Sequence, residues 1–234
     1  MRIVSLVPSS TETLLALGAD VVACTRFCEQ PHLRHVGGTK NPDLDAIVAL
    51  RPDLVVMDRE ENRLEDHEAL VAAGVTVFVS DVRSVADAVA LVGELTDIVG
   101  APPAVFERCR HVLAHQLATG GRRRAFVPIW RRPWMSIGPR TYGASLLDHI
   151  GIDLVTAGAA EPYPTVELDD VAALEPDLVL VPSEPYDFRE PHVAELAAVL
   201  VHSEIRAIDG QDLFWWGART PGALTRLADV TRTS

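Results

Sequence analysis

The chain has 234 residues, of which 48% are hydrophobic and 23% are charged, a composition typical of a folded globular protein. Its formal net charge of −12 argues against general nucleic-acid binding, because neutralising phosphates requires a surplus of lysine and arginine. No apolar run reaches the roughly 20 residues that are needed to cross a bilayer. Three cysteines, Cys24, Cys28 and Cys109, indicate a reducing compartment without a disulfide framework.

Short β-branched runs alternate with helical patterns along the first half, which is typical of βα units around a mostly parallel sheet. The predicted elements are strands at 3–7, 21–25, 54–57 and 75–79 and helices at 11–17, 42–50, 65–73 and 85–99. A further helix is predicted over 104–118, and the alternation restarts at Arg124. We therefore predict an α/β fold of two Rossmann-like lobes with mostly parallel sheets, 1–100 and 122–234, joined by a single bridging helix within 101–121.

An internal repeat supports two related lobes. Residues 43–55 (DLDAIVALRPDLV) match residues 167–179 (ELDDVAALEPDLV), and each copy reads as a short helix, a proline and a buried strand. Any two helix-Pro-Asp-strand units could look alike, but the copies lie at comparable places in their halves, which favours a genuine repeat. Two such lobes predict a cleft between them that holds a ligand.

Several motifs together carry a resemblance to a known family. They are RIVSLVPSSTE at 2–12, Gly37-Gly38, NPDLD at 41–45 and the segment 49–55. The chain resembles the helical-backbone substrate-binding proteins of ABC importers for cobalamin, haem and ferric siderophores, with the cobalamin-binding branch as the nearest match. The resemblance extends over nearly the whole chain, including WWGARTP at 215–221.

The resemblance implies a ligand-binding protein without chemistry of its own and without a required cofactor. Its bound ligand would be cobalamin or a related corrinoid, alternatively haem or a ferric siderophore. Its partner would be an ABC permease, docked through Asp45 and Asp169, one in each copy of the repeat. The alternative for both aspartates is that they only complement a helix dipole.

Importer components of this family carry an export signal, whereas residues 1–7 read directly as a strand. We therefore expect a cytoplasmic protein as written, which holds, buffers or senses its ligand. The alternative is that the true start lies upstream and the protein works outside the cytoplasm.

Candidate ligand contacts in the first half follow predicted strands. The loop 8–12 presents Ser9 and Ser10 at a helix start, where capping by Ser10 or Thr11 is the alternative role. Arg26 and Phe27 follow the second strand, and Lys40 precedes the repeated helix, so both groups could reach the same opening.

The second half is richer in aromatic candidates, because all four tryptophans lie in two loop segments beside arginines. Such loops suit a large flat ligand with anionic or amide edges, through stacking and charge-assisted hydrogen bonds. The alternative is that each tryptophan fills the core of its own lobe. The predicted contacts are Trp130, Trp134, Arg140, Tyr186, Trp215, Trp216 and Arg219.

No metal site is predicted, because neither Cys24 with Cys28 nor His111 with His115 completes a ligand set. The chain also lacks the Gly-x-Gly-x-x-Gly, phosphate-loop and Gly-x-Ser-x-Gly motifs. An enzyme that uses the same cleft, for instance on a nucleotide or sugar, remains the alternative from another class, because catalytic carboxylates leave no short motif.

Overall fold

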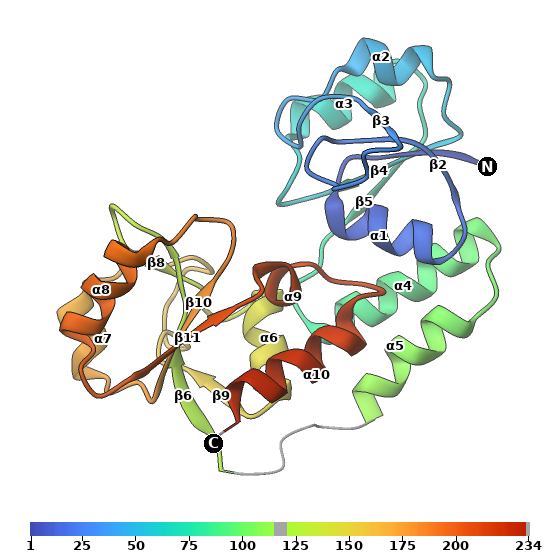
Figure 1. Cartoon of the computed structure of the whole chain (residues 1–234). Coiled ribbons are helices and arrows are strands. Elements are labelled where there is room, and N and C mark those ends of the chain that lie inside the picture. Colours follow the sequence, from blue (N-terminus) through green and yellow to red (C-terminus); the bar gives the residue numbers. More distant parts are fainter. Residues whose placement is uncertain (115–120, 233–234) are drawn as a thin grey trace. The chain divides into compact units, whose positions relative to one another are not determined.

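The computed structural model describes residues 1–114 and 121–232, which divide into two compact units (Figure 1). Unit 1 contains residues 1–82, 86–111 and 216–219, and unit 2 contains the rest of the described chain. None of the helices in these described residues is long and apolar enough to cross a membrane.

Unit 1 is built on a parallel five-stranded sheet with the strand order β3-β2-β1-β4-β5. The strands are β1 (Arg2–Ser5), β2 (Asp20–Cys24), β3 (Arg34–His35), β4 (Leu54–Asp58) and β5 (Val77–Ser80). The helices are α1 (Pro8–Ala16), α2 (Leu44–Ala49), α3 (Leu64–Ala72), α4 (Val85–Val99) and α5 (Ala104–Ala114).

Alternation along the strands of unit 1 sends apolar side chains to both faces of the sheet. Val4 and Met57 pack with Ile47 of α2 and Leu70 of α3 in one core cluster. Figure 1 shows α1 on the opposite face, where its Leu14 is buried. Because both faces are covered, the strands read as continuous apolar runs, as expected for a parallel sheet.

Unit 2 is built on a parallel four-stranded sheet with the order β11-β10-β6-β9 and a separate antiparallel hairpin, β7-β8. The strands are β6 (Arg123–Phe126), β7 (Pro128–Trp130), β8 (Met135–Ser136), β9 (Ile152–Leu154), β10 (Leu178–Pro182) and β11 (Glu204–Ile208). The helices are α6 (Tyr142–His149), α7 (Leu168–Ala173), α8 (Glu190–Val199), α9 (Gly210–Phe214) and α10 (Thr220–Thr231).

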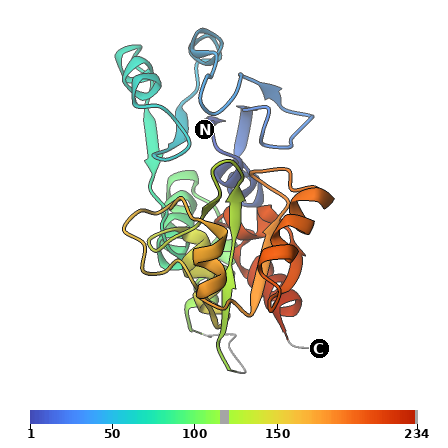
Figure 2. The same ribbon diagram turned by 90° about the vertical axis from the view of Figure 1, so that its left-hand side faces the viewer.

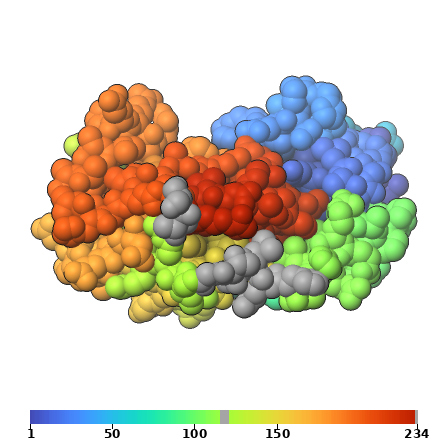
Figure 3. Space-filling model, turned by 60° about the horizontal axis from the view of Figure 1, so that its bottom comes forward, coloured from blue at the N-terminus to red at the C-terminus, as the bar shows by residue number. Residues whose placement is uncertain are grey.

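Helices cover both faces of the unit 2 sheet, as Figures 1 and 2 show. Phe126 and Val179 pack with Val171 of α7 and Leu196 of α8 in one core cluster. On the face seen in Figure 3, the red helix α10 lies at the surface. Its outward residues Arg226 and Asp229 are exposed, whereas the side facing the core is buried.

The internal repeat extends to the atomic level. In both copies the second residue after the helix has a positive φ, 47° at Arg51 and 48° at Glu175. An aspartate then accepts the backbone N–H of the first strand of its unit, over 2.6 Å from Arg2 to Asp53 and 2.7 Å from Arg124 to Asp177. The two parallel sheets also share a topology when β3 is left out. Neighbouring strands are the second, first, third and fourth of each sheet along the chain, β2-β1-β4-β5 in unit 1 and β9-β6-β10-β11 in unit 2.

The predicted α/β class with mostly parallel sheets is confirmed, and the bounds of α4 agree with the predicted helix 85–99. The two-residue strand β3 and the β7-β8 hairpin were not predicted, because both are too short to show a periodicity. The predicted helix 104–118 begins as α5, but its end and His115 lie outside the described residues. The predicted domain boundaries stay a prediction.

Candidate functional site

The carboxyl ends of the parallel strands in unit 1 form its candidate ligand surface. All five strands run in the same direction, so the residues that follow them meet at one edge of the sheet. The strand order reverses between β1 and β4, and ligands of such sheets bind outside the carboxyl ends at this point. We call residues 25–28, 37–41, 58–62 and 80–81 the carboxyl edge of unit 1.

Ser9 and Ser10 lie inside the first turn of α1 and not in a loop before it. The helix begins at Pro8, and its N-cap, Val7, makes no side-chain capping bond. The prediction that Ser10 or Thr11 caps the helix is therefore wrong, because Pro8 starts the helix earlier than predicted. Ser10 is fully buried, and its Oγ has no hydrogen-bond partner among the described residues. That Ser9 and Ser10 contact a ligand stays a prediction.

The structure brings Arg26 and Phe27 together with the loop that leads to Lys40. The Arg26 guanidinium lies over the exposed Phe27 ring, 4.7 Å from its centroid. A Cβ on Gly38 would lie 3.1 Å from the Phe27 ring and 3.3 Å from the Arg26 guanidinium. Glycine at position 38 therefore lets these side chains pack on the backbone. The three predicted residues share one side of the carboxyl edge.

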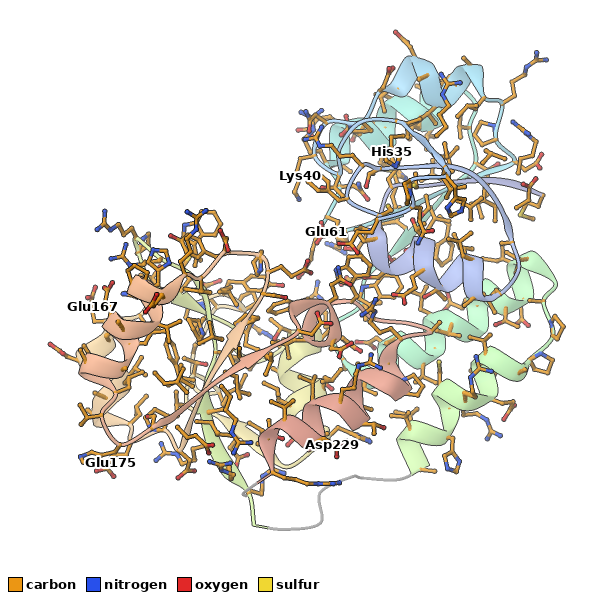
Figure 4. All side chains as sticks on the ribbon, viewed as in Figure 1. His35, Lys40, Glu61, Glu167, Glu175 and Asp229 are labelled. Carbon is orange, nitrogen blue, oxygen red and sulfur yellow. The ribbon has the colours of Figure 1, made fainter. Side chains whose placement is uncertain are left out.

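Lys40 connects two neighbouring loops of the carboxyl edge. Its Nζ donates to the backbone carbonyl of Glu60, so the loop after β3 is held against the loop after β4. Figure 4 labels Lys40 and Glu61 on these two loops. Lys40 is exposed and carries a charge at the rim of this surface.

A buried polar network below this rim was missed in the sequence. Asp58 ends β4, accepts a 2.7 Å hydrogen bond from Ser80 Oγ and accepts backbone N–H groups of Glu60 and Glu61. Burial raises the pKa of the Asp58 carboxyl, and the hydrogen bond from Ser80 opposes this shift. Asn62 donates to the carbonyls of Leu6 and Thr39. The signal was an aspartate placed directly after an apolar strand run.

In unit 2, the predicted Trp130, Trp134 and Tyr186 do gather in one place. Trp130 packs edge-on against Tyr186 with ring centroids 5.2 Å apart, and Trp134 stacks on Phe188 at 6.0 Å. Tyr186 also contacts Phe188 at 4.8 Å and His192 at 5.5 Å. We call these five side chains the aromatic cluster. They come from the β7-β8 hairpin, the loop after β10 and the start of α8.

The aromatic cluster has an open face and a depression beside it. Trp130 is 45% exposed although it is a large apolar side chain. The depression has a volume of about 380 Å³ and is lined by Tyr186, Asp187, Arg189 and His192. His192 accepts the backbone N–H of Arg189 at Nδ1, so its neutral ring carries the proton on Nε2 as a donor. An aromatic wall with polar groups at its edge suits a flat ligand with polar substituents.

Two arginines beside the aromatic cluster, Arg131 and Arg189, have acidic partners. Arg131 binds Glu195 at 2.6 and 2.8 Å while lying 5.9 Å from the Trp134 ring centroid. Arg189 pairs with Asp187 at 2.8 Å in the wall of the depression. Their charge is therefore largely neutralised at short range.

The remaining predicted contacts lie elsewhere. Trp215 and Trp216 are buried, at 9% and 6% exposure, and they belong to different units. Trp215 donates to Glu184 at 2.8 Å, Arg219 pairs with Glu12 at 2.8 Å, and Arg140 donates to the carbonyl of Ala160. Burial of both indole rings favours the alternative that they pack in the protein interior. That Arg140, Trp215, Trp216 and Arg219 contact a ligand stays a prediction.

Asp45 and Asp169 are exposed and occupy the same place in the two repeat copies. Each lies in the first turn of its helix, α2 or α7. This position fits both a docking role and a favourable interaction with the helix dipole. The docking role therefore stays a prediction.

The sequence is similar to that of known binding proteins. The sequence profile of a family described as periplasmic binding protein matches residues 3–196. A vitamin B12-binding protein of Yersinia pestis is 24% identical over 192 residues, covering 77% of this chain and 69% of the relative.

Solved structures share the fold of this chain. The periplasmic haem-binding protein of Vibrio cholerae superposes with a TM-score of 0.86 at 19% identity, covering 100% of this chain and 99% of the other. The periplasmic vitamin B12 binding protein of Vibrio cholerae superposes with a TM-score of 0.78 at 20% identity, covering 98% and 95%. With its profile match over most of its length, the chain belongs to the periplasmic binding protein family.

Proposed function

We propose that this chain binds a corrinoid such as cobalamin as the substrate-binding component of an ABC importer. The observation that carries the proposal is the aromatic cluster, in which the 45% exposed Trp130 contacts Tyr186, a residue that lines a depression with polar walls. Family membership and relatives named for vitamin B12 binding support it. Members of this family are binding proteins, which supports a role without catalysis.

The charge of the site favours a ligand with amide edges over one with carboxylate edges. Arg131 and Arg189 are each paired with a carboxylate, and the chain as a whole has a formal net charge of −12. A carboxylate on the ligand would have to displace Glu195 or Asp187 and would meet their repulsion. An amide can donate to the carboxylate and accept from the guanidinium without breaking the pair. Corrinoids carry amide side chains, whereas haem carries carboxylates.

Direct titration tests the ligand. The reduced protein is titrated with cyanocobalamin, hydroxocobalamin and haemin while tryptophan fluorescence and ligand absorbance are followed. We expect saturable one-to-one binding of the corrinoids and weaker binding of haemin. Tighter binding of haemin than of the corrinoids would mean that the ligand is haem and not a corrinoid, in line with the similarity to a haem-binding structure. Binding of none of the three would contradict the proposal.

Substitutions in the aromatic cluster test the location of the site. Trp130→Ala and Tyr186→Ala should each weaken corrinoid binding about tenfold, which corresponds to about 1.4 kcal/mol of lost stacking. Leu174→Ala is the matched control, because Leu174 is 40% exposed, close to the 45% of Trp130, but precedes β10 at the opposite end of the strand. An unchanged affinity in both cluster variants would show that the ligand binds elsewhere.

Permease docking through Asp45 and Asp169 is part of the proposal. Asp45→Lys and Asp169→Lys should leave corrinoid binding unchanged and weaken capture by vesicles that contain a cobalamin-importing ABC permease. Asp20→Lys is the charge control, because Asp20 is exposed at the amino end of β2. Equal losses in all three variants would point to net charge and not to docking at these positions.

The compartment is a separate proposal. A cytoplasmic protein would buffer or sense the ligand, whereas docking on a permease from outside requires export. Fractionation of cells that express the natural gene distinguishes the two roles.

A further inference from the structure

The depression beside the aromatic cluster holds polar groups whose positions the surrounding turn fixes. The backbone N–H of Phe188 donates to the carbonyl of Tyr186 over 2.9 Å, which places Asp187 at the tip of a tight turn. Arg189 Nε donates to Asp187 Oδ2 at 2.8 Å, and the Arg189 backbone N–H donates to His192 Nδ1 at 3.1 Å. The side chain and the backbone of Arg189 are therefore both anchored in the wall of the depression.

Each of these polar side chains keeps hydrogen-bonding capacity that the protein does not use. In the described part of the chain, Asp187 Oδ1 accepts no hydrogen bond and the Nη atoms of Arg189 donate none. The Nε2–H of His192 has no partner among the same residues. The side chains of Asp187 and Arg189 are 76% and 75% exposed, so a ligand can reach them. One acceptor and several donors therefore line a depression of about 380 Å³.

A neutral primary amide matches this set of groups, whereas charged groups of either sign do not. The NH₂ group of an amide donates to the carboxylate of Asp187, while its oxygen accepts from Arg189 or His192. A ligand carboxylate has no proton to donate and is repelled by Asp187. A ligand ammonium group cannot accept from the donors and is repelled by Arg189. The depression therefore selects a group that both donates and accepts without carrying charge.

We propose that this depression is a subsite for a primary amide carried by a ring that packs on the aromatic cluster. Tyr186 belongs to both surfaces, because it lines the depression and its ring lies 5.2 Å from that of Trp130 and 5.5 Å from that of His192. A ring on the cluster therefore has the depression within reach of its substituents. The inference deepens the proposed function, on which it rests for a corrinoid as the whole ligand.

Benzamide and benzoate test the subsite, because they share a ring and differ in the group that they offer to the depression. Binding of each to the full chain is followed at neutral pH, where benzoate is ionised, through the nuclear magnetic resonance signals of the tryptophan side-chain N–H groups. We expect benzamide to bind about tenfold more tightly than benzoate, a modest ratio because water screens the exposed charges. Equal affinities, tighter binding of benzoate or no binding of benzamide would overturn the proposal.

Asp187→Asn identifies the group that discriminates. Asparagine keeps an oxygen acceptor for Arg189 and removes the charge that repels benzoate, so the preference for benzamide should fall from about tenfold to about twofold. Asp229→Asn is the matched control, because Asp229, labelled in Figure 4, also forms an exposed pair with an arginine, Arg232 at 2.9 Å, but does not line the depression. An unchanged preference in Asp187→Asn, or an equal fall in Asp229→Asn, would show that Asp187 does not set it and that the proposal is wrong.

Cyanocobalamin and its monocarboxylic acids, in which a carboxylate replaces one amide, connect the subsite to the whole ligand. At least one of these acids should bind about tenfold more weakly than cyanocobalamin, and Asp187→Asn should reduce this loss. If no corrinoid binds while benzamide keeps its preference over benzoate, the proposed function is wrong and the amide subsite stands. If cyanocobalamin binds and none of the acids is weakened, the proposed function stands and the amide subsite is wrong.

Discussion

At the scale of single residues, the surroundings of a side chain decide its chemistry more than its type does. Cys28 and Cys109 are both buried cysteines, yet donors surround one and a carbonyl accepts from the other. Trp130 follows Ile129 and Trp216 follows Trp215 in the sequence, yet Trp130 is 45% exposed and Trp216 is 6% exposed. Composition and spacing do not distinguish the members of either pair.

Asp58 leads to a prediction on pH dependence. Because burial raises its pKa in the folded state, the folded chain binds more protons than the unfolded chain between the ordinary and the raised pKa. The contribution of Asp58 to the free energy of unfolding is therefore present below the ordinary pKa and falls as the pH rises through the folded pKa. Asp58→Asn removes this contribution and keeps an oxygen acceptor for the backbone N–H groups of Glu60 and Glu61.

The free energy of unfolding of Asp58→Asn, minus that of the unaltered chain, should increase as the pH rises above the ordinary aspartate pKa of about 4. Urea unfolding of both proteins at several pH values measures this difference. A difference that does not vary with pH would mean that Asp58 keeps its ordinary pKa in the fold.

At the scale of elements, the two repeat copies use the same device to join a helix to a strand. The aspartate after the proline accepts the N–H of the neighbouring strand, and its own N–H donates back to the same residue, from Asp53 to Arg2 and from Asp177 to Arg124. The device sets the register of the central strand pair in each sheet. It explains why Pro-Asp recurs in both copies.

Loss of this device should destabilise each unit by a similar amount. Asp53→Ala and Asp177→Ala should each lower the free energy of unfolding by about 1 kcal/mol, because one backbone N–H loses its carboxylate acceptor at an exposed site. Denaturant unfolding followed by circular dichroism measures the loss, with Asp20→Ala as an exposed aspartate control at the amino end of β2. Since the sites lie in different units, the double variant should lose the sum, and a smaller loss would contradict independent roles.

At the scale of the whole molecule, chain order and compact units do not coincide. Residues 216–219 belong to unit 1, although the residues on both sides of them belong to unit 2. Within unit 1, Thr13 Oγ1 accepts the backbone N–H of Ala218 at 3.1 Å, and Glu12 pairs with Arg219. The stability of the N-terminal sheet therefore depends on a segment near the C-terminus.

Gly217→Ala should destabilise unit 1 by about 2 kcal/mol or more. Gly217 has a φ of 106°, and a Cβ there would lie 2.0 Å from Thr13 Oγ1. Hydrogen exchange of β1 and α1, together with urea unfolding, measures the effect. Gly158→Ala is the control, because a Cβ at that position meets nothing within 4 Å. Unchanged protection of β1 and α1 in Gly217→Ala would contradict the coupling.

The sequence by itself determined the α/β class, the parallel sheets and the duplicated helix-Pro-Asp-strand unit. Each of these depends on local periodicity: alternating apolar runs bury strands, and the pattern over 85–99 forms a helix with those bounds. Local patterns also identified Trp130, Trp134 and Tyr186 as candidates, since aromatic residues and arginine are enriched at binding surfaces relative to the rest of a protein surface.

Only the tertiary structure decided which candidates meet. Trp130 and Tyr186 are far apart in the chain and touch because the β7-β8 hairpin packs near the end of β10, whereas the neighbouring Trp215 and Trp216 are buried in separate units. The network of Asp58, Ser80 and Asn62 and the hydroxyl groups around Cys28 likewise join residues from different strand ends, helices and loops. Loops have no repeating pattern, so their contacts follow from how the sheets and helices pack and not from the order of residues along the chain.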